Sequence, residues 1–259
     1  MYWPTAERLV YLDEKATPQF WDSHWRELGR PPEIGMRDDV IVMTRRYLSA
    51  GARVLEGGCG RANKVKALAD AGFSAFGIDF AQQSVARARL DYPGLDVRVG
   101  DVRALDIPDG CLDGYWSIGV IEHFWSGYDD ILSEAARALR PGGFLFLTAP
   151  WLSPYRLRKA RAGGYPRSDF TDEPSSFYQF ALSRREVTAA LTSRGFRLLT
   201  WGGRVSEISV RDDMTALKVP RDWLLGSRGS LLKRALRRAV FSTLNSWCGH
   251  SFLAVAQRP

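Results

Sequence analysis

The chain has 259 residues, of which 45% are hydrophobic and 25% charged, and its formal net charge is +7. This length suits one α/β domain with additions, or two small domains, and the composition excludes a disordered or fibrous chain. No apolar run approaches the roughly 20 residues that cross a bilayer, and the first residues lack a signal-peptide layout, so we expect a cytoplasmic protein. The three cysteines and three histidines show no disulfide or metal-ligand spacing, so no metal site is expected.

The N-terminal part, residues 1–50, is rich in aromatic side chains and is predicted to be mostly helical, with a break at Arg30-Pro31-Pro32. After it the chain alternates between strand and helix patterns. We expect strands over 54–55, 74–80, 95–101, 112–121 and 144–150, and helices over 62–71, 81–90 and 129–139. Strands that alternate with helices of about 10–15 residues indicate βαβ units, a parallel sheet and right-handed crossovers.

The last part of the chain contains a capping box, Ser183 to Glu186, which predicts a helix that ends at Gly195. Segments 196–201 and 251–257 have strand patterns. We therefore divide the chain into an N-terminal helical lid, 1–50, and one α/β domain, 51–259. This domain would carry insertions at about 151–182 and 212–248.

Glycines follow the first strand of the predicted sheet, in the stretch ARVLEGGCGRAN at 52–63. Gly57, Gly58 and Gly60 allow the backbone to turn tightly and to approach a ligand, because glycine has no Cβ. In an open parallel sheet, ligands bind beyond the carboxyl ends of the strands. The third glycine of a dinucleotide loop is absent, and Glu56 directly before the loop disfavours a pyrophosphate. The loop therefore favours a ligand that carries positive charge.

Two more acids are predicted at strand ends. Asp79 could accept hydrogen bonds from both hydroxyls of a ribose. Asp101, together with the backbone N–H of Val102, could read an adenine edge, and Phe80 could cover one adenine face. The plainer alternatives are that Asp79 caps a helix and that Asp101 caps a turn.

Four motifs occur in order along the chain: VLEGGCGRA, FGIDFA, VGDVRALDIPDGCLDGYWSIGVIEHF and LRPGGFLFLTAP. This series resembles class I S-adenosylmethionine-dependent methyltransferases over about residues 50–150, and weakly over 178–200. The resemblance implies a three-layer Rossmann-like methyltransferase fold, α/β, with a seven-stranded, mostly parallel sheet whose antiparallel last strand would be SFLAVAQ. It implies S-adenosyl-L-methionine as cofactor and S-adenosyl-L-homocysteine as product. Ala62 stands where many members have a third glycine.

Residue roles follow from the same resemblance. Glu56, Gly58 and Gly60 would line the methionine end of the cofactor, beside Gly57, and Ile118 would offer its carbonyl to the methionine amino group. Asp79 would hold the ribose, and Asp101 and Val102 the adenine.

Methyl transfer is an in-line displacement in which the enzyme mainly supplies proximity and alignment. A base is needed only if the acceptor must first lose a proton, and His123 in IEHF is the best-placed candidate, with loop orientation as its alternative role. Trp21 and Trp25 would either fold over the cofactor as part of the lid or simply pack in the core. The candidates for the substrate side are Trp25, Trp151, Tyr155 and Tyr178, with ordinary packing as the alternative for each.

Positive charge is concentrated in two segments. Residues 151–168 carry five basic residues and no acid, and residues 220–240 carry six against one acid. Arg234, Arg237 and Arg238 would share one face of an amphipathic helix. This face is either simply solvated, or selects an anionic acceptor, or rests through 228–241 on the inner membrane surface and presents a lipid-linked acceptor. Nucleic acid is disfavoured because no binding module is recognisable.

The sequence thus predicts methyl transfer to a small-molecule or lipid-linked acceptor, on an O, N or C atom. A nicotinamide-dependent oxidoreductase and a non-catalytic S-adenosylmethionine-binding protein are the alternatives.

Overall fold

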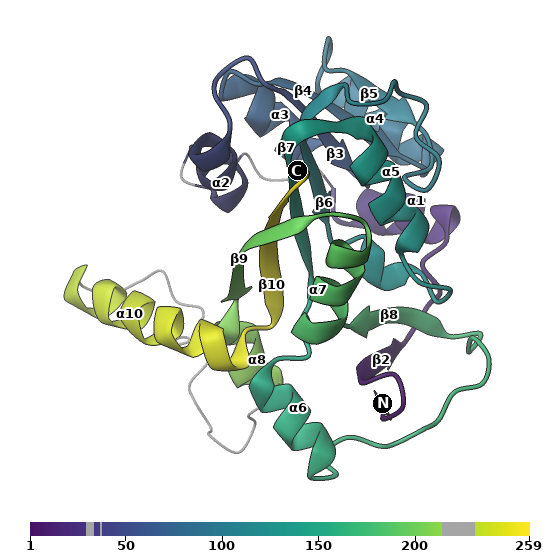
Figure 1. Cartoon of the computed structure of the whole chain (residues 1–259), viewed down its shortest axis with the longest axis vertical. Coiled ribbons are helices and arrows are strands. Elements are labelled where there is room, and N and C mark those ends of the chain that lie inside the picture. Colours follow the sequence, from purple (N-terminus) through teal and green to yellow (C-terminus); the bar gives the residue numbers. More distant parts are fainter. Residues whose placement is uncertain (30–33, 37, 214–230) are drawn as a thin grey trace.

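The computed structural model describes residues 1–29, 34–36, 38–213 and 231–259 (Figure 1). Its main sheet has seven strands in the order β5-β4-β3-β6-β7-β10-β9. Their bounds are β3 Arg53–Gly57, β4 Ser74–Asp79, β5 Val97–Val99, β6 Leu112–Ile118, β7 Leu139–Pro150, β9 Arg197–Arg204 and β10 Ser251–Gln257. The pairs β3·β4, β3·β6, β4·β5 and β6·β7 are parallel, whereas β10 is antiparallel to both β7 and β9. The predicted fold class, including its antiparallel last strand, is confirmed.

Helices cover both faces of this sheet, because successive strand residues point to opposite sides. On one face Val54 and Trp116 pack in a core with α2 Asp39–Tyr47 and α3 Asn63–Asp70. On the other face Leu55 and Tyr115 pack with α5 Asp129–Ala138 and α7 Arg184–Ser193. The helix α4, Gln82–Asp91, follows β4. The strands are buried on both sides, which explains their continuous apolar sequences.

The first residues differ from the helical expectation. They form a hairpin of β1, Tyr2–Trp3, and β2, Arg8–Leu12, which pairs with β8, Phe177–Ala181, to give a separate antiparallel sheet. In its register Leu9 lies opposite Ala181, and Leu9 and Val10 are buried. Pairing with a strand about 170 residues away therefore overrides local helical propensity. Helices begin only at α1, Pro18–Glu27, and α2.

Both predicted insertions contain regular structure. Residues 151–182 hold α6, Pro154–Arg161, and β8, and Trp151 forms a parallel bridge with Leu182. The second contains the end of α8, Ser206–Asp212, and the backbone of α10, Leu231–Cys248. Among the described helices, none has the length and apolar character that a membrane span would need. A lid role for residues 1–50 stays a prediction.

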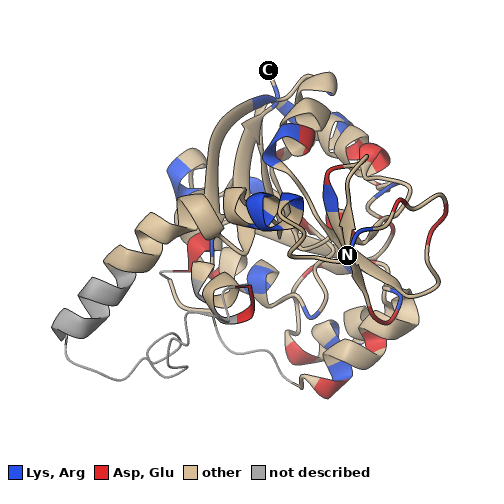
Figure 2. Cartoon of the chain, turned by 90° about the horizontal axis from the view of Figure 1, so that it is seen from below, with Lys and Arg blue, Asp and Glu red and all other residues tan. Residues whose placement is uncertain are grey.

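Basic and acidic positions are interspersed along the described chain (Figure 2). The first basic segment is largely paired inside the protein: Arg156 is 1% exposed and bonds to Asp213, and Arg161 bonds to Glu7. Lys159 donates to the Asp213 carbonyl. The side chains of Arg234, Arg237 and Arg238 lie outside the described residues, so the predicted basic face remains a prediction.

Candidate functional site

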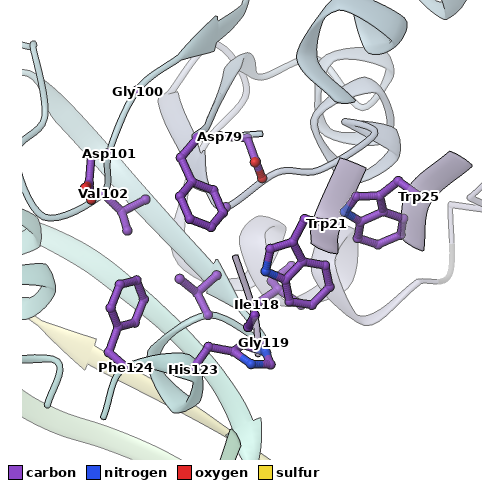
Figure 3. A pocket seen from close by; sticks show the side chains of 14 residues that line it. Trp21, Trp25, Asp79, Gly100, Asp101, Val102, Ile118, Gly119, His123 and Phe124 are labelled. Carbon is purple, nitrogen blue, oxygen red and sulfur yellow. The ribbon is translucent and has the colours of Figure 1, made fainter. Parts of the chain in front are cut away.

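A pocket opens at the carboxyl ends of β3, β4 and β6, where the sequence places its glycines and acids (Figure 3). The empty space between its walls, counted together with its open mouth, is about 670 Å³. It is lined by Ala16, Trp21, Trp25, Gly58, Asp79, Phe80, Gly100, Asp101, Val102, Ile118, Gly119, Val120, His123 and Phe124.

The glycine loop needs its glycines for conformation and for space. Gly58 and Gly60 have φ values of +75° and +49°, which side chains rarely adopt. A Cβ on Gly58 would lie 2.4 Å from Val120, and one on Gly60 would lie 2.8 Å from the Trp25 ring. Gly57 is not in the pocket wall; a Cβ there would strike the Tyr115 hydroxyl at 2.2 Å.

Ala62 takes the left-handed conformation, with φ of 57°, at the start of α3. For a residue with a Cβ this conformation costs roughly 1–2 kcal/mol. The departure from a third glycine therefore leaves the shape of the loop intact, at a cost in strain that the packing of the fully buried Ala62 methyl offsets.

Asp79 joins β4 to the glycine loop. One carboxylate oxygen accepts from the Gly60 N–H at 2.7 Å, and the other accepts from the Ala81 N–H at 2.8 Å. The side chain is 5% exposed, and burial raises its pKa. Because each carboxylate oxygen can accept more than one hydrogen bond, Asp79 can hold the loop and still face hydroxyls in the pocket.

Glu56 lies behind the glycine loop and not in the pocket wall. It is 4% exposed, and its Oε2 has no hydrogen-bond partner. Burial raises the pKa of its carboxyl to about 8, with Lys64 opposing the shift and Asp79 adding to it. A buried carboxyl with an unused oxygen is a natural partner for a cation.

The other end of the pocket is built by residues that follow β5. Asp101 lines it together with Val102, and its carboxylate is bound by the Arg103 guanidinium at 2.6 Å. This hydrogen bond lowers the pKa of Asp101. Arg103 also lies over the Phe124 ring, 5.1 Å from its centre. An adenine amino group would therefore share the Asp101 carboxylate with Arg103.

His123 sits where the pocket meets the small sheet. Its Nδ1 lies 2.8 Å from the Tyr178 carbonyl oxygen, and burial lowers its pKa to about 4. The ring contacts Trp21 and Tyr178, with centroids 5.1 and 5.0 Å away. The neutral imidazole is thus held in one orientation between α1 and β8.

Sequence reasoning missed the neighbour of His123 in IEHF. Glu122 is 2% exposed, its Oε2 has no partner, and burial raises its pKa to about 8. A Cβ on Gly119 would lie 3.5 Å from its Oε1, so this carboxyl lies behind the pocket wall. The sequence signal that could have pointed to Glu122 was its position directly before His123.

Two predicted substrate-side residues do not line this pocket. Trp151 packs against Trp201, with ring centroids 6.0 Å apart. Tyr155 contacts Trp247 and donates to the Asp213 carbonyl. Both lie toward β10 and α10, because the backbone after β7 bonds to His250. Trp25 lines the pocket against the glycine loop, and Tyr178 reaches it only through His123. Among the described residues no group of acidic, His or Cys side chains is arranged to hold a metal ion.

Comparison with known proteins agrees with this geometry. Residues 55–147 match the sequence model of a family described as "Methyltransferase domain". The chain is 32% identical to a "Probable S-adenosylmethionine-dependent methyltransferase" of Mycolicibacterium smegmatis, over 62% of this chain and 58% of that protein. It is 30% identical to the ubiquinone biosynthesis O-methyltransferase of Xanthomonas euvesicatoria pv. vesicatoria, over 64% and 71%. The match to the Mycobacterium tuberculosis relative Rv3030 covers 48%, about half, of the length of that protein.

Solved structures share the fold at low identity. The [4+2]-cyclase SpnF has a TM-score of 0.60 at 18% identity, over 96% of this chain and 98% of its own. A SAM-dependent methyltransferase from Methanosarcina mazei has a TM-score of 0.55 at 18% identity, over 83% and 96%. At this identity the likeness concerns the fold alone.

Proposed function

The chain belongs to the class I S-adenosylmethionine-dependent methyltransferases, and from this premise we propose that it transfers a methyl group from S-adenosylmethionine to a small-molecule acceptor. The observation that carries the proposal is the row of acids at neighbouring strand ends. Asp79 and Asp101 line one pocket, and Glu56 lies buried beside it with an unused oxygen.

The residues present fit the cofactor. Gly58 and Gly60 hold the loop in a turn that residues with a Cβ rarely adopt and that here leaves no room for one beside Val120 and Trp25, and the unpaired Glu56 oxygen suits an ammonium group. Asp79 would hold the ribose hydroxyls, and Asp101 with the Val102 N–H would hold the adenine. Ile118, at the end of β6, would offer its carbonyl to the amino group.

When bound, S-adenosylmethionine supplies a methyl group that its sulfonium already activates. The protein then has to align the acceptor and exclude water, which can lower the barrier by roughly 7–11 kcal/mol. Trp21 and Trp25, which line the pocket, would contribute to this exclusion. His123 can accept the acceptor's proton at Nε2, because its Nδ1 is already engaged with the Tyr178 carbonyl.

A small-molecule acceptor with an oxygen nucleophile is supported by two relatives. One is named a ubiquinone biosynthesis O-methyltransferase and another a fatty-acid O-methyltransferase. Support for an anionic acceptor is weaker, because Arg156, Lys159 and Arg161 are engaged within the protein. Membrane contact through 228–241, a lipid-linked acceptor and a cytoplasmic location stay predictions. Binding to anionic vesicles, compared with the triple change of Arg234, Arg237 and Arg238 to Gln, tests the membrane contact.

The central test is a side-by-side titration with S-adenosylhomocysteine and NADH by calorimetry. We expect only the first to bind, and binding to be lost in Asp79→Ala. Binding of NADH alone would overturn the proposal. Formation of S-adenosylhomocysteine from S-adenosylmethionine, without or with candidate acceptors, then separates an enzyme from a protein that only binds the cofactor.

A further inference from the structure

An aromatic cage surrounds His123. We use this name for Phe20 and Trp21 on α1, His123, and Tyr178 on β8. Trp21 meets His123 nearly perpendicularly, at an interplanar angle of 84°, and Phe20 contacts both Trp21 and Tyr178 at centroid distances of 5.1 and 5.7 Å. The four rings come from three segments that only the fold brings together. A flat molecule could take the place of one ring of this cluster, because rings pack best by stacking and by edge contacts.

The cage contains one hydrogen-bond acceptor with a defined orientation. A carbonyl oxygen can only accept, so the 2.8 Å contact with Tyr178 means that His123 Nδ1 carries the proton. In the neutral imidazole Nε2 is then the acceptor. A molecule that reaches His123 in the pocket therefore gains a hydrogen bond only if it brings a donor.

Charge in and near the cage is acidic. Among the described residues that line the pocket there is no Lys or Arg, and its only charged side chains are Asp79 and Asp101. Burial is the largest cause that raises the pKa of Tyr178, and the charged groups that add to it are two acids, Glu122 and Asp13. An anionic ligand would lose its hydration here, which is costly, and the nearby cation, Arg103, is already paired with Asp101.

Trp21 is only half-buried. The helix α1 has no buried residue, and its four aromatic residues at 20, 21, 24 and 25 are half-buried. Asp22 ties the helix to α4 through the Ser84 N–H and hydroxyl, both at 2.9 Å. In Figure 3 the indole of Trp21 lies beside His123 and Gly119. It fills the space next to the only oriented acceptor of the cage.

We propose that the acceptor is a planar, uncharged molecule with a hydroxyl group, and that it binds against His123 in the place where the Trp21 indole now lies. This inference rests on the methyl-transfer function proposed above and names its substrate class. In the reaction the hydroxyl oxygen forms the new bond to the methyl carbon as the bond from that carbon to sulfur breaks, and its electrons return to sulfur. The hydroxyl proton passes to His123 Nε2 and from there to water.

The test uses the full chain saturated with S-adenosylhomocysteine and four bicyclic probes of similar size, with calorimetry as readout. β-Naphthol is planar, neutral and hydroxylated; β-decalol is not planar, β-naphthoate is anionic, and naphthalene lacks the hydroxyl. We expect β-naphthol to bind about tenfold more tightly than each of the other three. Equal binding of β-decalol, or tighter binding of β-naphthoate, would overturn the inference.

Two variants test the named residues. In Trp21→Ala the place is already free, so β-naphthol should bind about threefold to tenfold more tightly than to the native chain. Trp247→Ala, at an exposed tryptophan of α10, is the matched control and should change nothing. In His123→Phe the ring is kept but the acceptor is lost, and β-naphthol should bind no better than naphthalene. Weaker binding to Trp21→Ala would show that Trp21 is a wall of the site and not its occupant.

The two proposals can fail separately. If S-adenosylhomocysteine does not bind, the proposed function falls. If S-adenosylhomocysteine binds but the native chain shows no preference for β-naphthol over the other probes, only the proposed substrate class is refuted. The comparison of the probes on the native chain needs no variant, so a variant that fails to fold does not affect it.

Discussion

Glu56→Gln separates the charge of the buried carboxyl from its shape. In the unliganded protein burial raises the pKa of Glu56 to about 8, so the group carries a proton at neutral pH. An ammonium group favours the ionised form. Cofactor binding should therefore release a proton, and affinity should increase as the pH rises toward 8.

The size of this effect follows from the pKa of about 8. Ionising the carboxyl costs about 1.4 kcal/mol at pH 7 and about 2.7 kcal/mol at pH 6, since each pH unit below the pKa corresponds to about 1.36 kcal/mol. We expect the Kd for S-adenosylhomocysteine to fall about tenfold per pH unit between pH 6 and 8. In Glu56→Gln this pH dependence should disappear. At pH 8 this variant should bind S-adenosylhomocysteine more weakly than the native protein does.

Calorimetry in buffers of different ionisation enthalpy measures the Kd and the protons released together. Asp101→Asn is the control, because Arg103 holds the pKa of Asp101 below its ordinary value and the group stays ionised throughout this range. It should weaken binding without changing the slope with pH. The same slope in the native protein and in Glu56→Gln would refute the assignment of Glu56 to the amino group.

Stability offers an independent readout for the same residue. The folded chain keeps the Glu56 proton up to about pH 8, whereas the unfolded chain releases it near 4.5. Folding therefore binds a proton in this window, and the free energy of unfolding falls as the pH rises from 4.5 to 8, by about 5 kcal/mol for this group alone. Glu56→Gln should remove that part of the decline in urea titrations.

Three further predictions concern the loop and the buried ion pair. Asp79→Ala leaves the Gly60 and Ala81 amides without their acceptor. It should lower the free energy of unfolding, measured with urea, by about 2–4 kcal/mol, and it should also abolish cofactor binding. Gly60→Ala places a Cβ 2.8 Å from the Trp25 ring; we expect weaker binding of S-adenosylhomocysteine and an altered near-ultraviolet tryptophan signal, and an unchanged Kd would contradict the proposed close approach. Arg156→Met leaves the buried Asp213 with the Tyr165 hydroxyl but without its cationic partner and should cost about 3–5 kcal/mol. The exposed neighbour Arg158→Met should stay within about 0.5 kcal/mol, and equal unfolding midpoints for these two would be inconsistent with a structural role for the pair.

The meeting of Asp79, Asp101 and Ile118 in one pocket could be predicted because its signals are local. Asp79 ends β4, Asp101 follows β5 and Ile118 ends β6, and all three line one pocket. Short apolar runs mark the strands, and parallel strands bring their carboxyl ends to the same edge. The position of each acid along the chain was therefore enough to place it in space.

Strands whose existence or ends depend on pairing with a distant strand were less predictable from the sequence. The strand β7 begins at Leu139, opposite Leu112, and runs through Pro141, Gly142 and Gly143, whereas the sequence predicts a strand only from residue 144. The hairpin of β1 and β2 was missed for the same reason, because its pairing with β8 is not visible in either segment alone. Trp151 and Tyr155 lie outside the pocket of Asp79 and Asp101, since the course of the chain after β7 depends on its bonds to the C-terminal segment, and their substrate-side role stays a prediction.

The position of His123 depends on these long-range strand pairs, whereas the positions of Asp79 and Asp101 do not. The orientation of His123 is fixed by a backbone carbonyl of β8, and β8 is held by β2 through the register that pairs Leu9 with Ala181. Arg8 adds an ion pair to Glu186 at 2.6 Å. A change in residues 8–12 can therefore shift His123 while Asp79, at the end of β4, and Asp101, in the loop after β5, keep their places. The N-terminal hairpin thus supports the position of His123 independently of the two acids that line the pocket.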